Sequence, residues 1–174
     1  MPMAMPMNET RERFVRTVMP HLDAAYNLAR WLVRDPHDAD DVVQESMLSA
    51  LRHLDALRGP DPRPWLLAIV RHASYALLRA RRPAEWIDVD ELDATEAAVF
   101  ADVPAWGDPE AAVIRSSERA LLDEAVAALP VPYREVLILR EFEDLSYRDI
   151  ARIADVPVGT VMSRLSRARR LLAQ

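Results

Sequence analysis

Apolar positions between 145 and 172 recur at helical spacing and predict two short helices joined by a tight turn. Ser146 can cap the first helix, and Asp149 follows three residues later in capping-box spacing. Asp155 falls at the turn, where Asp tolerates the left-handed backbone conformation, and Pro157 suits the first turn of the next helix. The second helix is predicted to bury one stripe of residues, namely Val158, Val161, Leu165, Ala168 and Leu172.

This second helix is strongly basic. Four Arg and no acidic residue fall between 158 and 174, a local charge of +4. A helix-turn-helix with such a second helix is suited to enter a DNA major groove. Helix-turn-helices that serve only for packing, and basic helices that only face solvent, show the same pattern. This part of the chain therefore leaves open the alternative that it does not contact DNA.

The N-terminal half predicts three further helices. The first spans about 9–34, with a kink or break at Pro20. Asp35 and Pro36 start the second, which runs to about Leu57. Its buried stripe is predicted to be Ala39, Val43, Met47, Ala50 and Leu54. Its other face is acidic at the start, where carboxylates offset the helix dipole, so periodicity alone favours a solvated surface made of Asp41, Gln44, Glu45, Leu48 and Arg52.

A proline-rich loop over 58–64 precedes the third helix, which is predicted to open at Trp65. Its core positions are predicted to be Leu66, Ile69, Val70, Ala73 and Leu77. The range 71–82 carries Arg and aromatic residues without any acid, and positive charge beside stacking surfaces is what single-stranded nucleic acid needs. Trp65 is the better candidate for a core aromatic, whereas for Tyr75 core and surface are equally supported.

Residues 84–114 carry nine acidic residues and no basic residue, a local charge of −9, and they show no lasting period. We therefore interpret this range as an extended acidic linker. Helices over about 111–128 and 133–142 follow it. The fold class predicted is all-α, with two small helical domains, 1–83 and 115–174, on either side of the linker at 84–114.

Composition excludes several functions. The chain has no Cys, which removes disulfides, thiol catalysis and Cys-based zinc sites. The four His are scattered, and neither a phosphate-binding Gly loop nor a nucleophile elbow is present. We therefore predict no catalytic residue, metal or cofactor. The chain has no run of membrane-spanning length and no signal-peptide pattern at its start, so we expect a cytoplasmic protein without membrane insertion.

The net charge of −6 argues against tight DNA binding by the chain alone, because its acidic segment repels phosphate. All 22 basic residues are Arg, which suits bidentate contacts to phosphate and guanine. We infer that a partner shields the acidic segment or brings DNA to the protein.

Two blocks of sequence resemble bacterial RNA polymerase sigma factors. Asp38-Ala-Asp-Asp-Val-Val-Gln-Glu-Ser-Met-Leu, followed by Arg63-Pro-Trp-Leu-Leu-Ala-Ile-Val-Arg71, resembles their region 2. Leu129-Pro-Val-Pro-Tyr-Arg-Glu-Val-Leu-Ile-Leu-Arg-Glu, with the helix-turn-helix after it, resembles region 4. The short length and direct linker are similar to the extracytoplasmic-function (ECF) group, and the resemblance covers about 10–172.

The resemblance implies a promoter-specificity subunit with three sets of contact residues. In this family the acidic helix of region 2 binds core RNA polymerase, here through Asp38, Asp41, Gln44 and Glu45. The loop and helix after it open the downstream promoter element and hold an extruded base, here through Arg58, Arg63, Arg71, His72, Tyr75 and Arg79. Region 4 reads the upstream element, here through Thr160, Met162, Ser163, Arg164 and Arg167. The linker would thread the polymerase cleft, and an anti-sigma factor is an expected partner.

Three positions depart from the family pattern. His72 stands where Asn is frequent, Asp155 where Gly is usual, and Met162 where Lys is frequent, so a phosphate contact is replaced by an apolar one to a thymine methyl. A stand-alone helix-turn-helix regulator with an N-terminal sensing or dimerisation lobe is the alternative function. A metal-dependent enzyme is a third and weaker hypothesis.

Overall fold

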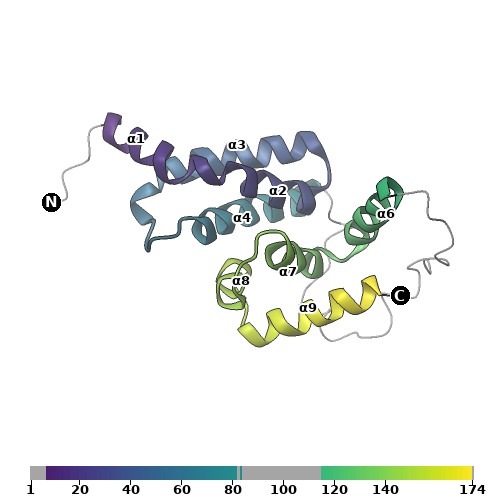
Figure 1. Ribbon diagram of the computed structural model, residues 1–174. Helices are drawn as coiled ribbons and strands as arrows, with labels where there is room; N and C mark the ends of the chain where they lie inside the picture. Colours follow the sequence, from purple (N-terminus) through teal and green to yellow (C-terminus); the bar gives the residue numbers. More distant parts are fainter. Residues whose placement is uncertain (1–6, 82, 84–114, 174) are drawn as a thin grey trace.

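The computed structural model describes residues 7–81, 83 and 115–173, and all regular structure in these ranges is helical. The predicted acidic linker lies outside the described residues. Figure 1 shows two groups of helices, an N-terminal lobe of α1 to α4 and a C-terminal lobe of α6 to α9, stacked on one another. The all-α fold class is confirmed.

In the N-terminal lobe, Pro20 breaks the first predicted helix. Helix α1 (Met7–Thr17) ends before it, a 3-10 turn (Met19–His21) contains it, and α2 (Leu22–Val33) follows. Helix α3 (Pro36–Arg52) then runs to a second 3-10 turn (Leu54–Ala56), so it ends before the predicted Leu57. Helix α4 (Arg63–Arg81) completes the lobe, and α2, α3 and α4 all pack against one another.

The start of α3 follows from its sequence. The Asp35 carboxylate accepts hydrogen bonds from the backbone N–H groups of His37 (2.9 Å) and Asp38 (3.0 Å), which would otherwise lack partners at a helix start. In the predicted stripe, Ala39, Val43 and Ala50 are buried, Met47 is half-buried, and Leu54 is buried in the 3-10 turn after the helix. This cap and stripe orient the acidic face of α3 away from the core.

The C-terminal lobe contains α6 (Arg115–Ala128), α7 (Val131–Glu141), α8 (Tyr147–Ala154) and α9 (Val158–Leu172). The Ser146 Oγ accepts the Asp149 N–H at 3.1 Å, which confirms the predicted cap of α8. Asp155 adopts the left-handed conformation at φ 53°, as its position in the turn predicts. The turn and both of its helices therefore form as the sequence indicates.

Two further details of the predicted helices were wrong. Val158 is 41% exposed, because it lies in the first turn of α9, before the helix reaches the core of its lobe. Helix α4 begins at Arg63 instead of Trp65, because Pro64 is tolerated in a first helical turn, where its missing N–H costs nothing. In the rest of the α9 stripe, Val161, Leu165 and Ala168 are buried and Leu172 is half-buried.

The lobes pack most extensively along two pairs of helices. Helix α4 packs against α8, and α2 packs against α7. One continuous cluster of buried apolar side chains draws residues from both lobes. Arg134 of α7, only 2% exposed, donates to the carbonyl of Leu32 in the last turn of α2 at 3.1 Å. Because a helix C-terminus carries partial negative charge, this cation joins the lobes favourably.

Candidate nucleic-acid and polymerase interface

The acidic face of α3 contains three of the four predicted polymerase contacts. Asp41, Gln44 and Glu45 are exposed along one side of the helix. Asp38 differs, because it is 8% exposed and its carboxylate pairs with Arg81 near the end of α4. It thus ties α3 to α4 in this arrangement, and its proposed contact with polymerase is not tested by this geometry.

A pocket of about 490 Å³ lies between α3 and α4. Glu45 lines it from α3, while Trp65 and His72 line it from α4. The predicted core aromatic Trp65 is therefore only partly buried. The pocket brings a predicted polymerase contact and a predicted DNA contact to the same side of the N-terminal lobe.

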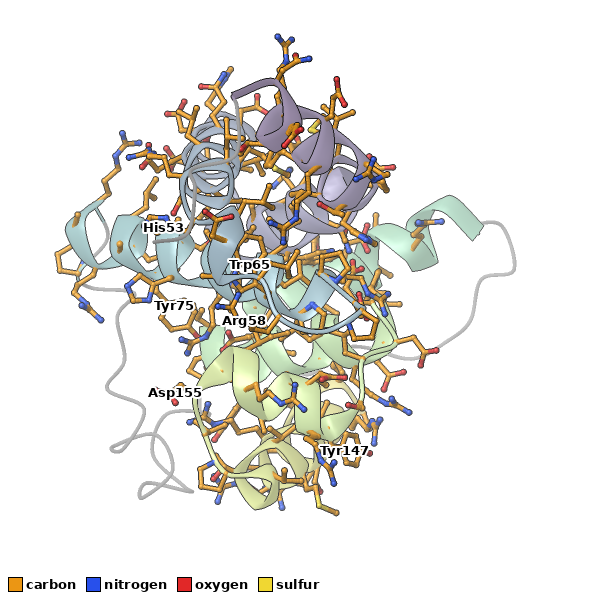
Figure 2. All side chains as sticks on the ribbon, turned by 90° about the vertical axis from the view of Figure 1, so that its left-hand side faces the viewer. His53, Arg58, Trp65, Tyr75, Tyr147 and Asp155 are labelled. Atoms are coloured by element: carbon orange, nitrogen blue, oxygen red, sulfur yellow. The ribbon has the colours of Figure 1, made fainter. Side chains whose placement is uncertain are left out.

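The loop before α4 lies against the C-terminal lobe. Its Arg58 is exposed and donates back to the carbonyls of Asp55 and, at 3.1 Å, Leu57. Arg63 donates to the carbonyl of Glu143 at 3.0 Å, across the junction between the lobes. Figure 2 shows Arg58 and Trp65 on the side of the N-terminal lobe that faces the C-terminal lobe.

Two predicted DNA contacts of α4 are held by one carboxylate of α7. Glu135 is fully buried, and its Oε1 pairs with the Nε of Arg71. Its Oε2 accepts a hydrogen bond of 2.8 Å from the Tyr75 hydroxyl. The Arg71 guanidinium also lies over the Tyr75 ring, 4.3 Å from its centroid. We call Arg71, Tyr75 and Glu135 the Glu135 cluster, and Figure 2 shows Tyr75 at the level where the lobes meet.

The surroundings of Tyr75 and Arg71 keep both of these groups protonated at neutral pH. Burial, and then the nearby Glu135 carboxylate, raise the pKa of Tyr75 well above 10.0, so the phenol remains a donor at neutral pH. Burial alone would lower the pKa of Arg71, but the attraction of Glu135 and Tyr75 outweighs it and raises that pKa. Arg71 and Tyr75 therefore both remain hydrogen-bond donors to Glu135 at neutral pH.

The basic helix α9 presents only part of its predicted reading set to the surface. Met162 is 54% exposed, Ser163 is exposed, and Thr160 is half-buried. Arg164 is 3% exposed and close enough to Tyr75 to affect its pKa. Arg167 is half-buried, with its guanidinium 3.5 Å from the Tyr133 hydroxyl.

Two predicted DNA contacts of α4 lie outside the Glu135 cluster. These residues, His72 and Arg79, are exposed.

Sequence reasoning missed Glu135 and Arg134. Both lie in the segment Leu129-Pro-Val-Pro-Tyr-Arg-Glu-Val, where charged residues on a short helix normally face solvent. The sequence did hold one signal of their burial. Helix α7 alternates little between polar and apolar positions, as expected for a helix surrounded on several sides.

Among the described residues, no group of three acidic or His side chains is placed to hold a metal ion. None of the described helices has both the length and the apolar character to span a membrane.

Both lobes match family models. Residues 17–83 match Sigma-70 region 2, and residues 119–172 match Sigma-70, region 4. The chain is 38% identical over 146 residues to the RNA polymerase sigma-H factor of Pseudomonas aeruginosa, covering 80% of this chain and 74% of that protein. It is 36% identical over 138 residues to the ECF RNA polymerase sigma-E factor of Escherichia coli, covering 78% and 72% respectively.

Solved structures extend the similarity over both lobes. The sigma factor RpoE of Bartonella quintana, in complex with the anti-sigma factor NepR, aligns with a TM-score of 0.68 at 25% identity. That alignment covers 92% of this chain and 94% of the other. CnrH, in complex with the cytosolic domain of CnrY, aligns with a TM-score of 0.64 at 25% identity, over 94% of this chain and 86% of CnrH.

Proposed function

Because the chain belongs to the ECF group of sigma-70 RNA polymerase sigma factors, and so is a promoter-specificity subunit for transcription initiation, we propose a division of labour between its lobes. The N-terminal lobe binds core polymerase and holds the opened downstream element, while the C-terminal lobe reads the upstream element. The boundaries proposed are 1–83, 84–114 and 115–174. The observation that carries this proposal is the exposed acidic face of α3 in one lobe and the basic helix α9 in the other, where Met162 and Ser163 are exposed.

The polymerase contact is proposed for the exposed residues Asp41, Gln44 and Glu45. Asp41→Arg reverses charge on this face without touching the core, so it should abolish co-purification with core polymerase while leaving the helical circular dichroism unchanged. Asp23→Arg makes the same charge change on the exposed side of α2 and serves as the matched control. If polymerase retains both variants equally, the α3 face is an ordinary solvated surface and does not bind polymerase.

Promoter reading is proposed for α4 and its preceding loop at the downstream element, and for α9 at the upstream element. In α9, Met162 is exposed and suits a thymine methyl, while Ser163 and Thr160 offer hydroxyl groups to base edges. Arg164 and Arg167 would complete the set when the lobes separate. Run-off transcription with purified core polymerase tests the whole function, and tight promoter binding by the chain alone, unimproved by polymerase, would favour the stand-alone regulator.

We further propose an anti-sigma factor as a partner, since RpoE and CnrH were both solved in complexes, RpoE with an anti-sigma factor and CnrH with the cytosolic domain of CnrY. The protein acts in the cytoplasm, where core polymerase and promoter DNA are found. It needs no catalytic residue of its own, because the polymerase performs the chemistry of RNA synthesis. A pull-down from native cells, analysed by mass spectrometry, should recover polymerase subunits and a small regulatory protein together with the chain.

A further inference from the structure

The first turns of α9 present apolar side chains to solvent. Val158 is 41% exposed and Met162 is 54% exposed. They are four residues apart, so they are neighbours on one face of the helix. Figure 1 shows α9 along the edge of the C-terminal lobe that lies away from the N-terminal lobe. We call Val158 and Met162 the apolar pair of α9.

The hydrogen-bonding side chains of α9 are less available than this apolar pair. The Ser163 hydroxyl donates to the Thr160 carbonyl of the same helix at 3.0 Å. Arg164 is 3% exposed, and Arg167 is half-buried with its guanidinium 3.5 Å from the Tyr133 hydroxyl. A side chain that gives up a contact inside the protein to reach a base gains little net free energy from the exchange. The apolar pair has no such contact to lose.

Positive charge lies beside the apolar pair, and it comes from α8. Arg148 and Arg152 are exposed, and together with Val158 they line an open hollow of about 530 Å³ at the turn between the two helices. Val156 and Pro157 add apolar surface to the same hollow. Arg binds phosphate through charge-assisted hydrogen bonds, and a thymine methyl offers apolar surface in the major groove. The hollow therefore combines groups for the DNA backbone with groups for a base edge.

We propose that Val158 and Met162 read the upstream promoter element by packing against the C5 methyl groups of two thymines. Arg148 and Arg152 bind the phosphates beside them. This inference rests on the proposed function and deepens it, because it takes α9 to lie in the major groove of that element. Residues four apart are about 6 Å apart along a helix, and neighbouring base pairs are about 3.4 Å apart, so the two thymines lie within two base-pair steps of each other.

The test removes one thymine methyl group at a time. The wild-type chain with purified core polymerase first selects promoters from a pool of double-stranded fragments of the host genome. The upstream sequence that the retained fragments share defines the element. Each thymine of the element, on either strand, is then replaced by deoxyuridine, which lacks only the methyl group. Competition against a labelled promoter duplex, followed by fluorescence anisotropy, measures the affinity of the holoenzyme for each substituted duplex.

For the wild-type holoenzyme we expect two thymines, no more than two base-pair steps apart, at which deoxyuridine weakens binding about fourfold. This is the effect of leaving one methyl group unburied. Val158→Ala should remove the sensitivity at one of these thymines, and Met162→Ala should remove it at the other. The matched controls make the same truncations at exposed positions of the N-terminal lobe. Val15→Ala (54% exposed) and Met19→Ala (39% exposed) should keep both sensitivities.

The outcomes separate this proposal from the function beneath it. A wild-type holoenzyme that transcribes its selected promoters but tolerates deoxyuridine at every upstream thymine would overturn the proposal alone. Thymines that stay equally sensitive in Val158→Ala and Met162→Ala would also overturn it, because the methyl groups would then contact other residues. A chain that gives no run-off transcript with core polymerase from any fragment would contradict the proposed function, and this proposal with it.

Discussion

Arg134→Met should destabilise the protein more than any surface change, because three backbone carbonyls depend on its guanidinium. Arg134 donates to Ala127 O (2.6 Å), Leu129 O (3.0 Å) and Leu32 O (3.1 Å) and is 2% exposed. Met has a similar unbranched shape but no donor. Hydrogen bonds to a charged group contribute about 1.5–3 kcal/mol each and are not additive, so we expect a loss of about 3–5 kcal/mol.

Urea unfolding followed by circular dichroism measures this loss in the free energy of unfolding. Arg152→Met is the control, since the Arg152 side chain is 68% exposed and its ion pair with Asp149 spans 3.6 Å; it should cost less than about 0.5 kcal/mol. Arg134→Lys should fall between the two, because one ammonium group cannot reach carbonyls from both lobes. A loss below about 1 kcal/mol for Arg134→Met would refute the reasoning, as it would mean that water replaces the guanidinium freely.

Two further changes test local features. Ser146→Ala removes the cap of α8 and should cost about 1 kcal/mol in urea unfolding, whereas Ser163→Ala, whose hydroxyl bonds only within exposed α9, should cost a few tenths; equal losses would contradict the cap. Tyr75→Phe removes the hydrogen bond to Glu135, and the stability advantage of wild type over this variant should stay constant up to pH 10 and shrink above it, because the pKa of Tyr75 is raised in the folded state and deprotonation then opposes folding. A stability difference that does not change above pH 10 would contradict this assignment.

Local signals in the sequence predicted the helices well. The cap at Ser146, the left-handed turn at Asp155 and the break at Pro20 each depend on the chemistry of one residue and its near neighbours. These features form whatever the rest of the chain packs against, because their hydrogen bonds and backbone preferences are satisfied within a few residues. The acidic face of α3 was predicted for the same reason.

Contacts between the lobes could not be predicted in this way. Glu135 and Arg71 are 64 residues apart in the chain, and no periodic pattern records that they meet. Arg164 was predicted to read DNA, yet it is 3% exposed, because it lies on the same face of α9 as the buried Val161, Leu165 and Ala168. Long-range packing decides the environment of such residues, and a helical period reports only on which side of its own helix each one lies.

The continuous apolar cluster that spans both lobes has a consequence for how long the protein survives in a cell. Each lobe is small, and small domains bury too little surface to be very stable alone. A molecule whose lobes have parted would expose part of this cluster and become a better substrate for proteases. Molecules whose lobes part without binding core polymerase would thus be degraded first. The lifetime of the protein would therefore depend on the supply of core polymerase.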